Sequence, residues 1–217
     1  HPFPGVVREF IVSEPGRAFL ERCRACGLEV EYELHAVREL LPRDRFAAHP
    51  EWFRMDDKGN RTPDTNCCVH SKDGMQTITE TAVAFAETLR PTTGRYFFWG
   101  DDGKPWCRCP ACRGFSDSDQ ALLFTNHLAD ALCKADTRAQ VAHLAYANTL
   151  SPPAKVAPHP QVFLEFAPIR RDYARPLDDP EAEVNRRHLE LLDANLAVFR
   201  RDTAQVLEYW LDCSMFS

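Results

Sequence analysis

The residues best suited to chemistry lie together in residues 99–114, whose sequence is WGDDGKPWCRCPACRG. Two adjacent carboxylates, Asp101 and Asp102, follow an aromatic run, and the three cysteines after them have C-x-C-x-x-C spacing. Neighbouring side chains on an extended segment point in different directions, so one carboxylate could orient a substrate while the other transfers a proton. An Asp-Asp-Gly sequence is also ordinary turn chemistry, because glycine tolerates a positive φ.

The cysteines of this stretch predict a shared site, because a C-x-x-C turn directs both sulfurs to one point. A tetrahedral zinc ion takes four nitrogen or sulfur ligands, so a fourth ligand must come from elsewhere in the chain. The candidate metal ligands are Cys68, Cys107, Cys109 and Cys112. Cys67 and His70 are alternatives to Cys68, since all three lie in the long segment 36–73. The resulting hypothesis is a structural zinc site.

Two other states of the cysteines remain open at this point. The chain has nine cysteines, and disulfides among them would leave at least one unpaired. Reduced cysteines would instead behave as small buried hydrophobic residues. A catalytic zinc is disfavoured because a site made of cysteines leaves no open coordination position. A catalytic cysteine is disfavoured because no base is identifiable beside these thiols in the sequence.

Helix and strand patterns alternate along the chain. Strands are predicted at 28–35, 95–100, 139–148, 161–169 and 205–212, with a sixth at 6–12 if that segment is counted. Helices are predicted at 14–27, 74–89, 116–135 and 179–202, the last with Asp179 as its N-cap. The segment 36–73 is predicted to be a long loop, a type of connection that often carries function.

This alternation predicts a single α/β domain over residues 1–217. The architecture that fits best is a (β/α)8 TIM-type barrel that is incomplete in this chain, because only five to six strands are recognisable. The alternative is a doubly wound sheet, which the absence of a G-x-G-x-x-G sequence after any strand disfavours. In a barrel, the long loop would cover the face formed by the C-terminal ends of the strands.

Polar and aromatic residues stand at or near the ends of several predicted strands. The candidate substrate-binding residues are His35, Trp99, Tyr146, Asn148, Glu208 and Asp212. Active sites of barrels are assembled at the C-terminal ends of the strands. Aromatic planes stack on sugar rings and carboxylates accept hydrogen bonds from hydroxyls, so these residue types favour a carbohydrate substrate.

Composition narrows the possible partners. The net charge is −6 and no long basic run is present, which disfavours nucleic-acid binding. No apolar stretch approaches the roughly 20 residues that span a bilayer. The N-terminal residues HPFPGVVREF lack the basic start and apolar core of a signal peptide.

An ordered set of motifs resembles a known family. These are HPEWF (49–53), NCCVHS (66–71), DDGKPWCRCPAC (101–112), LLFTNHLADAL (122–132), LAYAN (144–148) and LEYWLDCSMFS (207–217). Together they resemble a large bacterial, glycoside-hydrolase-like family formerly of unknown function. Some members of that family are endo-β-N-acetylglucosaminidases that act on N-glycans. The resemblance extends over most of the chain, roughly from His35 onward.

The resemblance implies a (β/α)8 barrel and hydrolysis with retention of configuration, assisted by the substrate's own acetamido group. In that chemistry Asp101 would orient the acetamido group and Asp102 would act as general acid and then base. The other residues at the strand ends would line the sugar pocket. Catalysis would need no cofactor, and the protein would be exported to the periplasm or secreted. The alternative hypothesis is a non-catalytic carbohydrate-binding or scaffold domain in which the cysteines only hold a loop in place.

Overall fold

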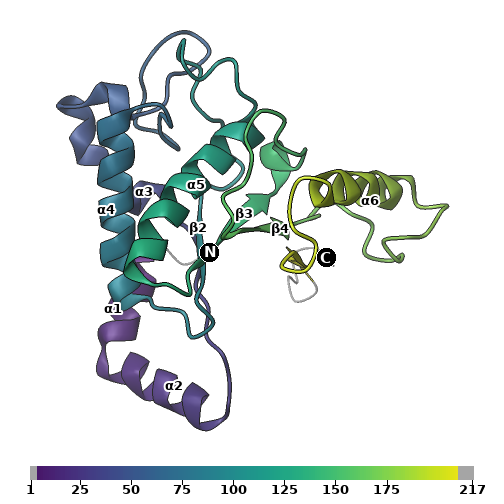
Figure 1. Cartoon of the computed structure of the whole chain (residues 1–217), viewed down its shortest axis with the longest axis horizontal. Helices are drawn as coiled ribbons and strands as arrows, with labels where there is room; N and C mark the ends of the chain where they lie inside the picture. Colours follow the sequence, from purple (N-terminus) through teal and green to yellow (C-terminus); the bar gives the residue numbers. More distant parts are fainter. Residues whose placement is uncertain (1–3, 210–217) are drawn as a thin grey trace.

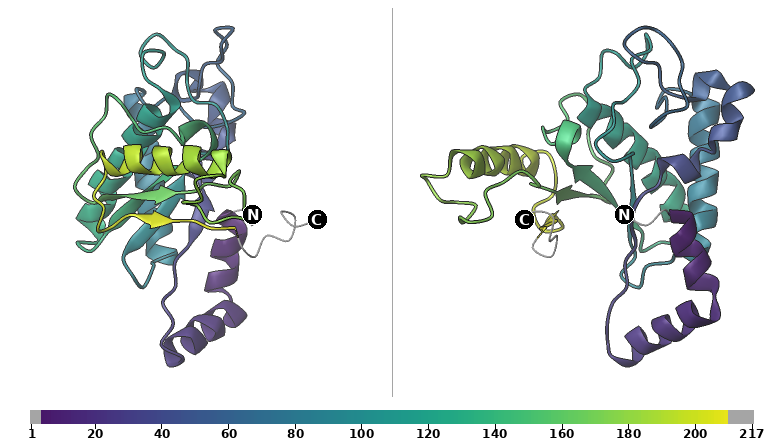
Figure 2. Two further views of the ribbon diagram at one scale, coloured as in Figure 1. Left: turned by 90° about the vertical axis from the view of Figure 1, so that its right-hand side faces the viewer. Right: turned by 180° about the vertical axis from the view of Figure 1, so that it is seen from behind.

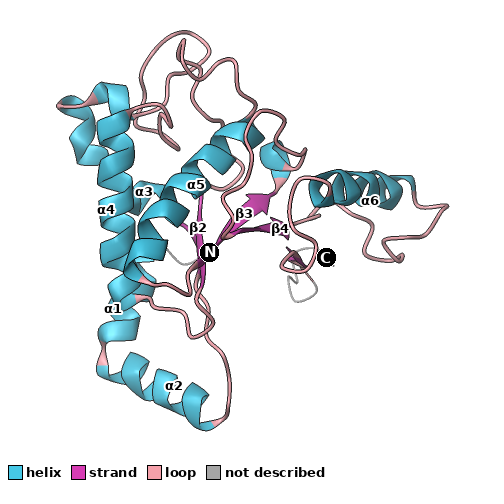
Figure 3. Cartoon of the chain, viewed as in Figure 1, coloured by secondary structure: helices cyan, strands magenta, loops and turns pink. Residues whose placement is uncertain are grey.

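The structure is a computed structural model that describes residues 4–209. Its centre is a five-stranded sheet in the order β1-β2-β3-β4-β5 (Figure 3). The strands are β1 (Glu33–His35), β2 (Arg95–Trp99), β3 (Gln140–Ala145), β4 (Val162–Phe166) and β5 (Gln205–Val206). Every neighbouring pair is parallel, so all five C-terminal ends lie along one edge. The predicted α/β class with parallel strands is confirmed.

Alternating side chains divide the sheet into two faces. Phe98 and Val141 point into the main hydrophobic core. Phe97 and Phe163 point the other way and form a second, smaller cluster with Trp99 and neighbouring residues. Because side chains alternate along a strand, the continuously buried β2 supplies both clusters. We call the face of Phe97 and Phe163 the second face.

The helices α4 (Lys72–Thr88), α5 (Asp117–Ala135) and α6 (Glu183–Leu196) all contribute to the main core. In Figure 1, α4 and α5 lie together on one side of the strands, and α6 lies at the β4 end of the sheet. No described helix residue joins the cluster on the second face. The helices therefore cover a single face of the sheet.

The predicted start of α5 is confirmed by its capping contacts. The Ser116 side chain accepts a hydrogen bond from the Asp119 backbone, and the Asp119 side chain accepts one from the Ser116 backbone. This reciprocal pair satisfies N–H groups that the first helical turn leaves unpaired. Helix α5 packs against β2 and β3. The position of its first turn therefore also fixes the end of the loop that carries Cys107, Cys109 and Cys112.

The prediction of a sixth strand at 6–12 is wrong. These residues lie in the helix α1 (Pro4–Val12), which is followed by α2 (Glu14–Ala25) at one end of the molecule (Figure 1). Val7 and Ile11 pack against the core, and their i, i+4 spacing places them on one side of a helix. The short apolar run is compatible with either structure, and packing selected the helix.

The prediction of Asp179 as the N-cap of the last helix is also wrong. Helix α6 begins at Glu183 with Ala182 as its N-cap. The Asp179 side chain instead accepts a hydrogen bond from the Glu181 backbone N–H at 2.9 Å. Asp179 and Pro180 therefore form a turn before the helix, a role that this sequence pattern serves equally well.

The long segment 36–73 is ordered by short helices and buried anchors. It contains α3 (Val37–Leu40) and the 3-10 turns η1 (Arg43–Ala47) and η2 (Pro50–Trp52). Leu40, Leu41 and Phe53 are fully buried. The segment lies beside residues 104–112, as shown by the hydrogen bond from Arg108 N–H to Met55 O at 2.8 Å. It is therefore a packed part of the domain near the C-terminal edge of the sheet.

The strands β1 and β5 are shorter than predicted. β1 pairs only through Glu33–His35, and β5 only through Gln205–Val206. Each has one neighbour in the sheet and lies at its edge (Figure 2). Among the described residues, no helix is both long and apolar enough to cross a membrane.

Candidate active site and metal centre

Asp101 is held rigidly at the C-terminal end of β2. Its Oδ2 accepts hydrogen bonds from the Asn66 backbone N–H at 2.6 Å and from the Arg43 guanidinium at 3.1 Å. Only 14% of the side chain is exposed. Among the described residues no hydrogen bond reaches Asp101 Oδ1, so that oxygen can still accept one from a ligand.

Asp102 has the opposite character, since 54% of its side chain is exposed. The His35 side chain lies next to it, with Nε2 3.9 Å from Asp102 Oδ1. The other ring nitrogen, His35 Nδ1, lies 2.6 Å from the Gly100 carbonyl oxygen. A carbonyl oxygen can only accept, so Nδ1 carries the hydrogen and Nε2 faces the carboxylate. The two adjacent carboxylates thus occupy different environments, as the sequence predicted.

Aromatic residues from several strand ends surround Asp102. Burial, followed by the charge of Asp102, raises the pKa of Tyr146. Burial and the nearby Tyr146 and Tyr173 raise the pKa of Tyr209. The edge of the His35 ring meets Trp99, with 5.4 Å between the ring centroids. Aromatic side chains therefore line the C-terminal edge of the sheet, and the Asp102 carboxylate is exposed among them.

A small pocket lies between these residues and the start of α5. It is lined at the strand ends by His35, Trp99, Asp101, Tyr146 and Asn148. His143 also lines it, and neither His143 ring nitrogen nor Trp99 Nε1 has a hydrogen-bond partner among the described residues. An open cleft continues from Tyr146 past Ile169, Arg170 and Tyr173. Tyr146 lines both the pocket and the cleft.

Two predicted sugar-binding residues are engaged by protein groups instead. The Asn148 amide donates to Asp117 Oδ2 at 2.6 Å and to Lys104 O at 3.1 Å. Glu208 accepts from Arg171 Nε at 3.1 Å. Both stand at strand ends as expected, but a ligand would have to compete with these partners. Asp212 lies outside the described residues.

Sequence reasoning missed the residues of segment 36–73 that hold Asp101. Asn66 is fully buried, and its backbone φ of 44° is in the left-handed region. Asparagine adopts that region more readily than most residues, because its short polar side chain forms local hydrogen bonds. Asn66 is not part of a spaced motif in the sequence, so nothing there predicts that it holds Asp101. Arg43 likewise has no sequence signal beyond its charge.

Four buried cysteines meet next to this turn. The sulfurs of Cys68, Cys107, Cys109 and Cys112 all lie within 4.8 Å of one another. Cys68 Sγ lies 3.7 Å from Cys109 Sγ and 3.7 Å from Cys112 Sγ. A tetrahedral ion with bonds of about 2.3 Å to sulfur requires sulfur–sulfur edges of about 3.8 Å. The four cysteines could therefore hold a metal ion with little rearrangement.

Hydrogen-bond donors surround the sulfur atoms. The Met55 and Cys109 backbone N–H groups donate to Cys107 Sγ at 3.3 and 3.4 Å. The His70 Nδ1 lies 3.2 Å from Cys112 Sγ. Such donors stabilise the thiolate form that metals bind and orient the ligands. His70 therefore lies beside the group. The fourth sulfur comes from Cys68, which the sequence analysis named as the candidate ligand.

The pKa values of the thiols in the group are shifted in opposite directions. Hydrogen bonds from Cys107 and Cys112 lower the pKa of Cys68. Hydrogen bonds with Cys107 and Cys68 raise the pKa of Cys112. One thiolate is thus stabilised by the remaining thiols, because four negative charges cannot be crowded together without a cation. A divalent ion would supply that cation.

The remaining cysteines are separate from the group. None of the eight described cysteines forms a disulfide. Cys67 is fully buried, and its burial raises the pKa of its thiol. Cys23 is buried on α2, whereas Cys26 at the end of that helix is exposed.

The comparisons with known proteins yield one family. Residues 18–206 match the family described as domain of unknown function DUF4838. No curated protein and no solved structure matches the chain. Since the match spans most of the sequence, the chain belongs to the DUF4838 family.

Proposed function

We propose that this protein is a glycoside hydrolase that acts on glycans containing N-acetylhexosamine, with retention of configuration and assistance from the substrate's acetamido group. The observation that carries the proposal is the pair of adjacent carboxylates at the end of β2. Asp101 is fixed by two donors, whereas Asp102 is exposed beside His35 and Tyr146. A reaction with one orienting and one proton-transferring carboxylate requires two such different environments.

We also propose that the sheet is a section of a (β/α)8 barrel. The five strands follow one another in sequence order and are all parallel. A doubly wound sheet reverses its strand order and carries helices on both faces. Here the described helices pack on one face only, and the second face carries buried side chains that no described helix covers. The interior of a barrel is likewise filled by side chains from its strands alone. In such a barrel the pocket and cleft lie at the catalytic end.

The proposed roles follow from the two carboxylates. The acetamido N–H of the substrate donates to Asp101 Oδ1, which aligns the acetamido oxygen with the anomeric carbon. As the acetamido oxygen forms its bond to the anomeric carbon, the bond between that carbon and the leaving-group oxygen breaks. Protonated Asp102 gives its proton to the leaving-group oxygen. Asp102 then accepts a proton from the water that opens the cyclic intermediate. Trp99 and Tyr146 line the sugar pocket.

The test is hydrolysis of N-glycans and of aryl N-acetylglucosaminides by the wild type and Asp102→Asn. We expect the variant to lose at least 100-fold in kcat/KM, the lower end of the general acid–base range of about 10²–10⁴. The control is Asp130→Asn, an exposed carboxylate on α5 whose partner is His159. Retained hydrolysis in Asp102→Asn would remove Asp102 from the reaction.

A second candidate function is carbohydrate binding without hydrolysis. The observation that favours it is the aromatic lining of the pocket and the cleft by Trp99, Tyr146 and Tyr173, because aromatic rings can stack on sugars without any bond being cleaved. Saturable glycan binding with no product after prolonged incubation would select this candidate. The same result would contradict the hydrolase.

We propose zinc as the ion of the cysteine group. Four sulfur ligands favour zinc over magnesium or calcium, which prefer oxygen, and a site closed by protein ligands is structural. Elemental analysis of the purified protein should give one equivalent of zinc, and Cys112→Ser should reduce it. Cys133→Ser is the matched control, since Cys133 lies outside the group. A wild-type content below about 0.1 equivalent would refute the proposal.

A further inference from the structure

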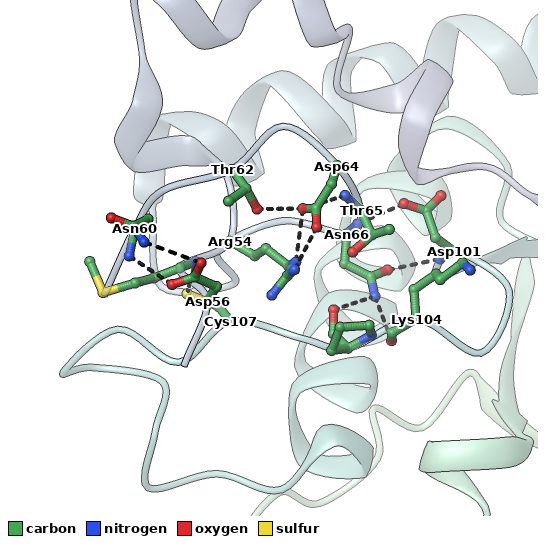
Figure 4. A network of polar contacts seen from close by, with 12 residues as sticks. Arg54, Asp56, Asn60, Thr62, Asp64, Thr65, Asn66, Asp101, Lys104 and Cys107 are labelled. Carbon is green, nitrogen blue, oxygen red and sulfur yellow. Dashed lines mark hydrogen bonds and ion pairs between the residues drawn. The ribbon is translucent and has the colours of Figure 1, made fainter. Parts of the chain in front are cut away.

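Asn66 forms a complete set of contacts with the turn that carries the two aspartates. Its backbone N–H donates to Asp101 Oδ2 at 2.6 Å, and its side-chain Oδ1 accepts from the Asp101 backbone N–H at 2.8 Å. Its side-chain amide donates to Lys104 O at 3.0 Å and to Pro105 O at 3.1 Å. Figure 4 shows the Asn66 side chain between Asp101 and Lys104. One residue thus fixes both sides of the turn.

The cysteine group joins the same two segments of the chain. Cys68 belongs to segment 36–73, and Cys107, Cys109 and Cys112 follow the aspartate turn. Cys67 alone separates Asn66 from Cys68, and Trp106 alone separates Pro105 from Cys107. The hydrogen bonds of Asn66 and the four sulfurs are therefore consecutive cross-links between two adjacent segments. A displacement of the cysteine group is therefore separated from the contacts of Asn66 by only one residue in each segment.

The space between these two cross-links is tightly packed. Trp106 is only 2% exposed. A Cβ atom added at Gly100 would lie 2.7 Å from the Trp106 ring and 3.1 Å from Asn66 Oδ1. Close packing transmits displacement because there is no void to absorb it. Loosening of the Cys107 end would therefore move Trp106 against Gly100 and the aspartate turn.

We infer that a metal ion held by Cys68, Cys107, Cys109 and Cys112 sets the position of the Asp101–Asp102 turn, and that Asn66 is the positioning residue through which it acts. This inference rests on the proposed function, because the turn is taken as the catalytic one. The ion neither touches substrate nor takes part in the reaction. It keeps the two segments cross-linked, and Asn66 converts that cross-link into a fixed orientation of Asp101. Without the ion, the two segments are held at this point only by hydrogen bonds, the Arg43–Asp101 ion pair and side-chain packing, all of which are noncovalent.

The first arm of the experiment measures amide hydrogen exchange with and without Zn²⁺. Wild-type protein is stripped with a chelator and part of it is reloaded with one equivalent of Zn²⁺. We expect peptides covering residues 100–106 to exchange at least tenfold faster in the stripped protein and to recover on reloading. Peptides covering β4 should be unchanged. Unchanged exchange at 100–106 would overturn the inference, and so would loss of protection throughout the protein, since the ion would then hold the whole fold.

The second arm uses Asn66→Ala loaded with Zn²⁺, with Asn60→Ala as the matched control. Asn60 lies in the same segment but is exposed and bonds only within its own turn, to Asp56. We expect Asn66→Ala to keep one equivalent of zinc, to exchange faster at 100–106, and to lose at least tenfold in kcat while KM changes less than twofold. Asn60→Ala should match the wild type in all three. Wild-type exchange and kcat in zinc-loaded Asn66→Ala would overturn the role of Asn66.

The two arms separate this inference from the proposed function. Exchange and zinc content are measured without any glycan. A zinc-dependent turn in a protein that hydrolyses no glycan would support the structural coupling and contradict the hydrolase. If Asn66→Ala does not fold, the comparison of stripped and reloaded wild type decides the coupling by itself.

Discussion

Gln205 on β5 donates a hydrogen bond to Glu165 on β4, with 2.7 Å between Gln205 Nε2 and Glu165 Oε1. Glu165 is fully buried, and its other oxygen, Oε2, has no hydrogen-bond partner among the described residues. Burial, reinforced by the charge of Glu33, raises the pKa of Glu165 to about 8. The carboxyl group is therefore mostly protonated at neutral pH, which avoids an uncompensated charge on the second face.

This pair predicts a loss of stability as pH rises from 4.5 toward 8. The folded-state pKa of about 8 lies above the ordinary value of 4.5, so the folded protein binds the proton more tightly than the unfolded chain. The contribution to stability is complete below the ordinary value and is lost as pH rises toward 8, at about 1.4 kcal/mol per pH unit. Glu165→Gln should remove this slope in urea unfolding measured between pH 6.5 and 8, above the range in which His143 contributes. Exposed Glu190→Gln on α6 is the control, and an equal slope in both variants would contradict the assignment.

His143 predicts a loss of stability on the acid side. Burial lowers its pKa to about 4 from the ordinary 6.5, and its ring stacks on Phe199 at a centroid distance of 5.1 Å. The unfolded chain takes up the proton first, so stability is complete above 6.5 and declines toward pH 4 by about 1.4 kcal/mol per unit. The Glu165 contribution has the opposite slope over much of this range, so the His143 effect is measured in the Glu165→Gln background. There, His143→Leu should flatten this part of the urea unfolding profile. Exposed His127→Gln should leave it unchanged.

Gly100 is predicted to tolerate no side chain. A methyl group there would approach the Trp106 ring to 2.7 Å, well inside contact distance. Gly100→Ala should therefore lower the free energy of unfolding by about 1–3 kcal/mol, the usual cost of overpacking. Gly114→Ala on the same loop is the control, because a Cβ there meets nothing within 4 Å. Thermal unfolding of the two variants measures the difference, and equal stability would show that the turn has room to move.

His35 is predicted to act on the reaction through Asp102. His35→Phe keeps a ring of similar size against Trp99 but removes the nitrogen 3.9 Å from Asp102 Oδ1. We expect kcat for N-acetylglucosaminide hydrolysis to fall at least tenfold, with KM changed less than twofold. His49→Phe is the matched control, since His49 stacks on Trp52 at 4.0 Å and an aromatic replacement keeps that stack. A wild-type kcat in His35→Phe would limit His35 to a packing role.

The sequence by itself predicted the elements with strong periodicity. Helix α4 (Lys72–Thr88) and helix α5 (Asp117–Ala135) lie within two residues of the predicted ranges, because a long amphipathic repeat has few alternatives. In α5 a capping box also marks the first turn. Strand β2 was predicted from a different signal, the short aromatic run at 95–100 that ends at a turn sequence. The segment 6–12 was not predicted correctly, since a run of seven residues is too short for periodicity to separate helix from strand.

The candidate site divides in the same way. Cysteine spacing indicated that Cys107, Cys109 and Cys112 converge, because local chain geometry controls a C-x-C-x-x-C turn. Only tertiary structure decided that Cys68 joins them, since Cys67 and His70 were equally near in sequence. Likewise, the sequence placed Asp101 and Asp102 at a strand end but could not distinguish them. The fixed state of Asp101 comes from Asn66 and Arg43, which lie 35 and 58 residues away along the chain, and contacts at such distances arise only when the fold packs the segments together.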